Sequence, residues 1–418
     1  MSTGVLVAVG VVNFEADVLS VAAEPQMHVV RRCVDVADLV ATAASRQADV
    51  ALISAQLRGV DAEIVDRLRS EGVAVVGVVA EASSADEALL RQIGVEHVAS
   101  VDDLVSLAEL VTQAVRSPLL PTDADVLCDR DESDESRPLR RSGRVVAVWG
   151  PTGAPGRSTV ALGVSAALST AGASTHLIDA DVYGGAVAAM LGMLDESSGL
   201  LAAARAANTG SLTVDSLAAH ARQVDRNLRV LTGLPRADRW TEVKAVLLRN
   251  ILEVSRSLAA FTVVDCGFNL EFDEEISYDT SAPRRNGATV EALERADVVL
   301  VVGAADPLSL SRLIRGVSEL KTVVPSAAPW IVLNKLRTSS GWSPDEVVST
   351  VRKSTGVRSV RVLPDDPASC SRALMYGRSL AECAPDAKLS KAMDALAGEL
   401  VVAGRGAPQV VVRRRRWR

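Results

Sequence analysis

A glycine-rich stretch, Gly150–Thr159, carries the residue types that bind phosphate. Its sequence is Gly-Pro-Thr-Gly-Ala-Pro-Gly-Arg-Ser-Thr. The apolar run Val145–Trp149 before it predicts a buried strand, and Ser158–Ala171 after it predicts a helix. In such a strand–turn–helix unit, backbone N–H groups and the positive end of the helix dipole face the anion. The stretch therefore predicts a phosphate-binding loop.

The last residues of this loop, Gly156-Arg157-Ser158, include an arginine where P-loops have lysine. Arginine keeps the positive charge and binds phosphate well, but its planar fork is larger than an ammonium group and not interchangeable with it. Pro155 lacks the backbone N–H that such a loop donates. These residues predict nucleotide binding more strongly than fast hydrolysis.

Three carboxylates accompany strands predicted further along the same region. Asp179 and Asp181 follow the strand predicted at 175–178, and Asp265 ends the run 261–264. At the carboxyl ends of parallel strands, such carboxylates can hold metal-bound water or orient an attacking water. A single aspartate at a strand end is more often a helix cap or turn residue. Because these carboxylates follow two separate strands after a phosphate loop, we interpret them as one nucleotide–Mg²⁺ site.

Residues 1–116 alternate five predicted strands with helices, which resembles the receiver domain of response regulators, a flavodoxin-like α/β fold. A working receiver needs acidic residues after its first strand and an aspartate after its third. Here Ser54 stands at the acceptor position, and Ser100 lies near the place of the late lysine. We expect an interaction module that lacks the phospho-acceptor; a plain α/β domain without receiver ancestry is the alternative.

The rest of the chain divides into three segments by composition. Residues 117–143 are dense in acidic residues and predict a flexible linker. Residues 144–404 alternate strands and helices, which predicts an α/β domain with a mostly parallel sheet covered on both faces. Within it, Glu271–Arg285 does not fit the alternation, and a surface loop beside the site is the default interpretation. The basic tail, 405–418, ends in Arg413–Arg418, which suits an anionic membrane or nucleic acid; a solvated tail is equally compatible.

The order of motifs in the second domain resembles the MinD/ParA group of P-loop ATPases. The motifs are Gly153–Thr159, Asp179-Ala-Asp181, Val263-Val-Asp265-Cys-Gly267, Leu333-Asn-Lys335 and Leu363-Pro-Asp-Asp366. A receiver-like domain preceding such an ATPase is similar to the CpaE/TadZ branch, and most of all to actinobacterial CpaE-like proteins.

The resemblance implies roles for the matched residues. Ser158 and Asp265 would ligate Mg²⁺ with support from Asp179, Asp181 would position the attacking water, and Arg157 would contact the phosphates. ATP would lie against Gly153, Ala154, Pro155, Gly156, Arg157, Ser158, Thr159, Asn334 and Pro364.

The segment Asn334-Lys-Leu-Arg337 favours adenine over guanine. Guanine recognition uses a carboxylate at the fourth position, whereas arginine offers only donors. Asn334 can pair with the amino group and ring nitrogen of adenine. An ordinary turn residue is the alternative for Asn334.

Two further positions depart from the MinD/ParA pattern. Ala154 places a methyl group where the family has glycine, which matters if the position needs a positive φ. Thr152 stands where the family has its signature lysine, which crosses the dimer interface. Losing one transition-state cation costs about 10³–10⁵ in rate by comparison with arginine fingers. We therefore expect slow or partner-dependent hydrolysis of ATP to ADP and phosphate.

Composition limits the classes of protein that remain. The chain has 418 residues with a formal charge of −7, which gives no general case for nucleic-acid binding. Its five cysteines form no CxxC pair, and no apolar run reaches the roughly 20 residues of a membrane helix. The sequence starts Met-Ser-Thr-Gly without a basic segment, so no secretory signal is expected. We expect a cytoplasmic protein, with peripheral contact at the inner membrane face left open.

Taken together, the sequence predicts an ATP-binding, Mg²⁺-dependent positioning or assembly factor that forms a nucleotide-dependent homodimer. The resemblance implies protein partners in a pilus or secretion, division or chromosome-partitioning apparatus. A degenerate scaffold without significant hydrolysis is the alternative, supported by Arg157, Thr152 and Pro155. A DNA-segregation protein is a third possibility that depends on the arginine tail alone.

Overall fold

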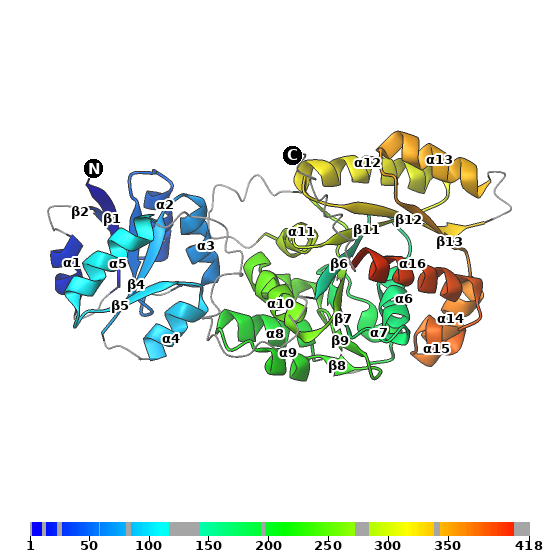
Figure 1. The fold of residues 1–418 in the computed structure, drawn as a ribbon, viewed down its shortest axis with the longest axis horizontal. Coiled ribbons are helices and arrows are strands. Elements are labelled where there is room, and N and C mark those ends of the chain that lie inside the picture. Colours follow the sequence, from blue (N-terminus) through cyan, green and yellow to red (C-terminus); the bar gives the residue numbers. More distant parts are fainter. Residues whose placement is uncertain are drawn as a thin grey trace, which may run out of the picture. The chain divides into compact units, whose positions relative to one another are not determined.

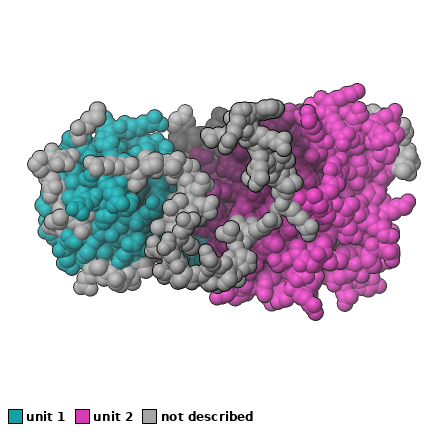
Figure 2. Space-filling model, in the orientation of Figure 1, with its two compact units in different colours: residues 1–140, 205–212, 273–283 teal, residues 141–204, 213–272, 284–418 magenta. Residues whose placement is uncertain are grey.

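The chain forms two compact units (Figure 2). The computed structural model describes residues 2–10, 14–22, 27–57, 59–80, 85–116, 143–193, 197–271, 284–337 and 343–404. The first unit comprises residues 1–140, 205–212 and 273–283, and the second comprises 141–204, 213–272 and 284–418. The predicted linker lies outside the described residues except for Gly143, and the predicted tail lies outside them altogether. The predicted domain boundaries therefore stay predictions.

The first unit contains a parallel five-stranded sheet in the order β2-β1-β3-β4-β5 (Figure 1). Its elements are β1 (Thr3–Ala8), α1 (Glu15–Ala22), β2 (Met27–Arg32), α2 (Val36–Ala43), β3 (Val50–Ile53), α3 (Ala62–Ser70), β4 (Ala74–Val79), α4 (Ala85–Gln92), β5 (His97–Ser100) and α5 (Leu104–Arg116). The order 2-1-3-4-5 is that of flavodoxin-like folds, which include receivers. The predicted strands and their alternation with helices agree with this topology.

Ser54, at the position where a receiver has its phospho-acceptor, follows β3 directly. Its side chain is buried, and its hydroxyl donates a hydrogen bond to the Val9 carbonyl at 2.6 Å. The hydroxyl is thus engaged by the backbone, and the role of this unit as an interaction module stays a prediction.

The second unit contains an eight-stranded sheet in the order β13-β12-β11-β6-β10-β7-β9-β8. The strands are β6 (Arg144–Trp149), β7 (Thr175–Ala180), β8 (Arg222–Gln223), β9 (Leu228–Leu231), β10 (Phe261–Cys266), β11 (Val298–Ala304), β12 (Pro329–Leu336) and β13 (Val360–Pro364). All neighbours pair in parallel except β8 and β9. The strands predicted at 145–149, 175–178 and 261–264 correspond to β6, β7 and β10, with ends that differ by at most two residues.

Helices cover both faces of this sheet (Figure 1). They are α6 (Arg157–Thr170), α7 (Val187–Met190), α8 (Gly199–Asn208), α9 (Val214–His220), α10 (Ala245–Leu258), α11 (Gly287–Glu294), α12 (Pro307–Val323), α13 (Pro344–Thr355), α14 (Pro367–Tyr376), α15 (Leu380–Cys383) and α16 (Lys388–Gly404), with a 3₁₀ turn at Ala237–Glu242. Successive residues of β6 point to opposite faces, and Val145–Trp149 are all buried. The sheet is therefore buried on both sides, as predicted.

Small residues bring the helix after the phosphate loop close to its neighbours. Residues 160–169 of α6 are all buried, and the helix packs along α16. A Cβ placed on Gly163 would come within 3.2 Å of the Met393 side chain, so glycine permits this close approach. The dense packing fixes the start of α6 relative to the sheet.

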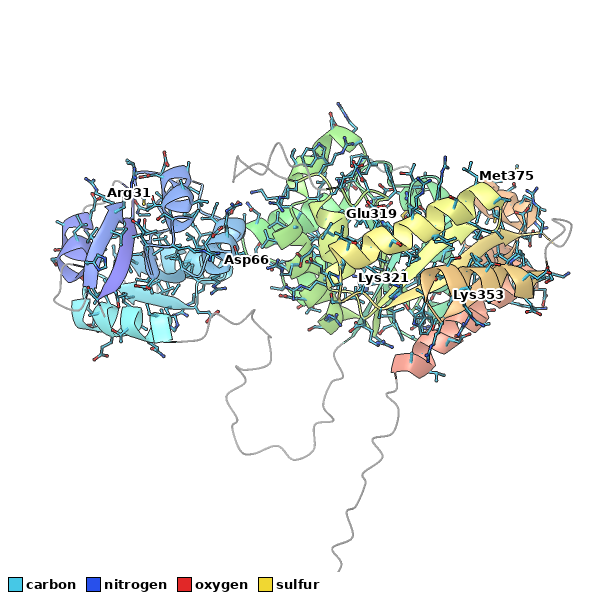
Figure 3. All side chains as sticks on the ribbon, turned by 90° about the horizontal axis from the view of Figure 1, so that it is seen from above. Arg31, Asp66, Glu319, Lys321, Lys353 and Met375 are labelled. Carbon is cyan, nitrogen blue, oxygen red and sulfur yellow. The ribbon has the colours of Figure 1, made fainter. Side chains whose placement is uncertain are left out.

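Caps and a side-chain bond fix α12 and α13 in place. Asp306 accepts a hydrogen bond from the Ser309 N–H at the start of α12, and Pro307 occupies its first turn. The Lys321 ammonium donates to the Thr355 carbonyl at 2.7 Å, which joins the end of α12 to that of α13. Figure 3 labels Lys321 on α12 and Lys353 on α13. Helix α12 packs against β11, and α13 packs against β13.

Candidate functional site

The loop between β6 and α6 has the backbone shape of a phosphate cradle. Gly153 and Gly156 have φ of +74° and +94°, in the left-handed region that glycine enters without strain. Gly156 is the N-cap of α6, and no side chain caps that end. The first N–H groups of α6 thus lack a side-chain acceptor and suit an anion.

Neighbouring groups leave no room for side chains on the loop glycines. A Cβ on Gly156 would lie 2.3 Å from the Asn334 amide nitrogen, and one on Gly150 would lie 2.4 Å from the Val302 carbonyl oxygen. Ala154 is different: the only non-glycine residues with positive φ in the described chain are Arg46 and Lys335. The methyl group of Ala154 therefore causes no left-handed strain, and the structural concern raised by its departure from glycine does not arise.

Arg157 lies across the loop and pairs with one of the predicted catalytic carboxylates. Its guanidinium donates to the Gly150 carbonyl at 3.1 Å and to the Asp181 carboxylate at 3.2 Å. It also lies 5.8 Å from the centre of the Phe268 ring. Only 16% of the Arg157 side chain and 8% of that of Asp181 are exposed, so solvent screens this ion pair weakly. A nucleotide that recruits Arg157 must compete with Asp181.

Asp265, in β10, is a buried carboxylate whose oxygens meet no donor at hydrogen-bonding geometry in the described part of the chain. Neither of its oxygens has a partner among the described residues. Burial raises the pKa of Asp265 well above its ordinary value, and the charge of Asp179 raises it further. The Ser158 hydroxyl and the Arg157 guanidinium oppose that rise in part. A buried carboxylate can be ionised at low cost only when a cation lies beside it, so Asp265 suits a cation ligand.

The residues around Asp265 fit Mg²⁺ bound together with a nucleotide. Mg²⁺ usually takes one or two carboxylates, keeps several waters and shares substrate phosphates. Nowhere in the described ranges do three or more His, Cys, Asp or Glu side chains gather as a metal cage. The orphaned oxygens of Asp265 and the hydroxyl of Ser158 supply the small donor set that such an ion requires.

Asp179 is committed to the backbone that follows β7. The strand continues through Ala180, so Asp179 lies inside it, next to Asp265 in register. Its carboxylate accepts hydrogen bonds from the Val187 N–H at 3.0 Å and the Asp181 N–H at 3.4 Å. Burial raises the pKa of Asp179 to about 7. These contacts favour a positioning role for Asp179 over direct metal ligation.

The turn after β7 holds Asp181 in place. One oxygen of Asp181 accepts from the Tyr183 N–H at 2.9 Å and the Gly184 N–H at 3.3 Å, while the other accepts from Arg157. A Cβ on Gly267 would lie 3.4 Å from Asp181. Asp181 therefore lies where a carboxylate can reach the phosphate loop.

The predicted base-binding residues occupy the ends of β12 and β13. Asn334 is buried, and its side-chain N–H donates to the Pro155 carbonyl at 3.0 Å, which ties β12 to the loop. Pro364 ends β13. Thr159 lies on the first turn of α6 and lines a hollow together with residues of α7, α14 and α15. The structure brings Asn334 to the loop through Pro155, a contact that the sequence did not indicate.

Several residues near these carboxylates carried no signal in the sequence. The buried hydroxyl of Thr289, on α11, has no partner in the described part of the chain and would lie 3.0 Å from a Cβ on Gly267. The Tyr183 and Phe268 rings lie 4.9 Å apart, centre to centre. The guanidinium of Arg285 lies 4.2 Å from the centre of the Tyr183 ring. The glycine in the motif ending at Gly267 could have drawn attention to this region, and Arg285 ends the segment predicted as a surface loop beside the site, of which residues 272–283 lie outside the described ranges.

Comparisons with known proteins agree with the fold and the loop. A ParA family model, described as NUBPL iron-transfer P-loop NTPase, matches residues 141–225. The cell division ATPase MinD of Pyrococcus furiosus aligns with a TM-score of 0.50 and 20% identity, covering 62% of this chain and 99% of that one. A ParA family ATPase of Chlorobium tepidum aligns with a TM-score of 0.51 and 20% identity, covering 61% and 98%. Comparison with curated proteins finds no match.

These likenesses establish the fold class. The second unit has the P-loop NTPase fold of MinD and ParA ATPases, as the motifs predicted. The family model supports a relationship to that group over residues 141–225, and the two structures show a shared fold; the CpaE/TadZ branch receives no separate support. None of the described helices is long and apolar enough to cross a membrane.

Proposed function

We propose that the chain is a MinD/ParA-type protein that binds ATP with Mg²⁺ and acts as a nucleotide-switched positioning or assembly factor. The observation that carries this proposal is the buried carboxylate of Asp265, which has no hydrogen-bond partner among the described residues. It accompanies a loop whose glycines and uncapped helix end suit phosphate. A Mg²⁺–triphosphate complex would supply a cation for the Asp265 carboxylate and an anion for the N–H groups of the loop.

Each side chain of the site then has one task. The N–H groups at the start of α6 hold the phosphates, and Ser158 and Asp265 hold the Mg²⁺ ion, which neutralises phosphate charge when bound. Asp181 orients the attacking water through its free lone pairs. Asn334 and Pro364 face the base, for which we propose adenine.

The Arg157–Asp181 pair gives the site two states. In the described structure Arg157 is held by Asp181. ATP competes for the guanidinium, because bidentate contact with phosphate is at least as favourable as contact with a carboxylate. Binding therefore releases Asp181 for its water and changes the position of the segment that follows β7. Such differential contact is what couples a nucleotide to a conformational switch.

The same pair supports slow or partner-dependent hydrolysis. Arg157 is both the replacement for the usual lysine and a partner of the carboxylate that must act on water. Thr152 supplies no cation to a second subunit. We propose that a nucleotide-dependent homodimer and a protein partner complete the site, with a pilus, secretion, division or chromosome-partitioning apparatus as the setting. The receiver-like unit would dock such a partner.

Nucleotide binding and turnover measured together test this proposal. We expect ATP–Mg²⁺ to raise the melting temperature of the wild type, by the mass-action effect of a bound ligand. We expect slow ATP turnover that is lost in Asp181→Ala and raised in Arg157→Lys, while Arg157→Ala weakens binding. Absence of any thermal shift at millimolar ATP–Mg²⁺ contradicts the proposal.

A scaffold that binds ATP without significant hydrolysis is the second candidate, favoured by the hold of Asp181 on Arg157. It predicts a thermal shift with ATP–Mg²⁺ but no turnover that responds to Asp181→Ala. The arginine tail at 413–418 lies outside the described residues, and its target stays a prediction. Loss of vesicle or DNA binding on deletion of that tail would identify it.

A further inference from the structure

Helix α12 lies directly against the phosphate loop. A Cβ on Gly316 would come within 2.8 Å of the Pro151 ring, so the absence of a side chain at Gly316 allows the loop to pack closely against the helix. On the sheet side, a Cβ on Gly303 of β11 would come within 2.9 Å of Leu313. Two glycines thus allow α12 to approach the sheet and the loop closely, and the position of the helix is set by both contacts.

Arg312 is one turn before Gly316 and therefore lies on the same face of α12. Its side chain runs past Gly153: a Cβ on Gly153 would lie 2.3 Å from Nη1, 3.4 Å from Cζ and 3.9 Å from Cδ. The guanidinium therefore occupies the space that a side chain at position 153 would need. Gly153 is required twice, once for its φ of +74° and once for Arg312.

The guanidinium of Arg312 has no counter-ion in the described part of the chain. It makes no hydrogen bond or ion pair there, although the side chain is half-buried. Arg157, by contrast, is paired with Asp181, and Arg249 is paired with Glu291. A guanidinium has five N–H donors, and leaving them all without a protein acceptor in a half-buried position is unfavourable. Its location beside an exposed loop of N–H groups indicates an anionic ligand.

We propose that Arg312 is a phosphate-binding residue that contacts the terminal phosphate of ATP in the same chain. This inference rests on the proposed function. The N–H groups at the start of α6 would hold the inner phosphates, and Arg312, which lies beside Gly153 at the other side of the loop, would reach the terminal phosphate. Arg312 would supply, from α12, a positive charge that Thr152 does not supply from the loop. An arginine provided within the same chain is a known means of stabilising phosphoryl transfer.

The test compares Arg312→Met with wild type for ATP and ADP binding and for ATP turnover, all with Mg²⁺. Methionine keeps most of the apolar stem and removes only the charge. We expect the affinity for ATP to fall about ten- to a hundredfold, as for loss of a charge-assisted hydrogen bond, and that for ADP to stay within about twofold. Turnover should fall further than ATP affinity, because transition-state charge depends more on the cation.

Two further variants serve as controls. Arg315→Ala removes an exposed arginine from the same helix and should leave affinity and turnover unchanged. Arg312→Lys keeps a charge and should retain part of the preference for ATP over ADP; it also tests the proposal if Arg312→Met does not fold. Equal ATP affinity and turnover in Arg312→Met and wild type, or equal loss of ATP and ADP binding, overturns the assignment. Failure of wild type to bind either nucleotide refutes the proposed function itself.

Discussion

Replacing Asp265 with asparagine should stabilise the unliganded protein while removing its response to Mg²⁺ and ATP. The carboxylate is buried without hydrogen-bond partners in the described structure, and burial raises its pKa well above the ordinary value. The folded state thus holds a proton that the unfolded state releases. The resulting stabilisation is complete below the ordinary pKa, near 4, and is lost as the pH rises through the raised pKa. Asparagine has the same shape and no such loss.

The size of the effect follows from linkage. Within that pH window, wild type loses about 1.4 kcal/mol of unfolding free energy per pH unit relative to Asp265→Asn. For a unit of this size, that corresponds to a gap in melting temperature that widens by about 4 °C per pH unit. Asp179 is next to Asp265 in register and its charge acts on Asp265, so the difference between the two proteins reports the titration of this pair of carboxyl groups.

The assay is thermal unfolding of both proteins in EDTA at pH 5, 6 and 7, then with Mg²⁺ and ATP. We expect the advantage of Asp265→Asn to grow with pH in EDTA, and Mg²⁺ with ATP to stabilise only the wild type. Asp345→Asn, which removes an exposed carboxylate, should behave like wild type: its stability difference from wild type should not grow with pH, and Mg²⁺ with ATP should stabilise it. A gap that stays constant with pH, or a variant less stable than wild type throughout, would refute the reasoning.

Two further predictions concern backbone and pH. Gly156→Ala should lower the free energy of unfolding by about 1–2 kcal/mol because of its left-handed φ, and further because the new methyl group clashes with Asn334. Gly172 also has a left-handed φ (+85°), but a Cβ there meets nothing within 4 Å, so Gly172→Ala is the control without a clash. Chemical denaturation of both variants measures the difference, and equal losses of unfolding free energy would contradict the clash. His176 is buried beside Ser255, and burial lowers its pKa to about 3. As the pH falls below about 6.5, the unfolded state binds a proton on His176 that the folded state does not. The free energy of unfolding of wild type should therefore fall by about 1.4 kcal/mol per pH unit relative to that of His176→Gln. Parallel pH profiles of unfolding for the two proteins would show that His176 does not titrate in this way.

Local sequence patterns predicted most strands because the strands are short, apolar and buried on both faces. The run Val145–Trp149 is an example, since every one of its residues is buried in β6. The strand order was less accessible, because β10 lies between β6 and β7 although it follows both in sequence by many residues. Such pairing depends on crossover geometry that no local pattern encodes. The fold class was nevertheless correct.

The positions of the loop and of the carboxylates could be predicted from the sequence, whereas the contacts between their side chains could not. Glycine spacing and strand-end aspartates identified the loop and carboxylates, because these depend on local backbone conformation. The contact between Arg157 and Asp181, and that between Asn334 and Pro155, join residues 24 and 179 positions apart. Arg312 was missed for the same reason, since an arginine on a later helix carries no motif.

The packing of the loop also separates what can vary from what cannot. The glycines at 150, 153 and 156 are each blocked by a different neighbour, whereas Thr152 is exposed between them. The contacts that fix the backbone of the loop therefore do not involve the side chain of residue 152. An evolving or engineered chain can exchange that side chain, lysine included, and so change the charge above the loop without altering the backbone beneath it.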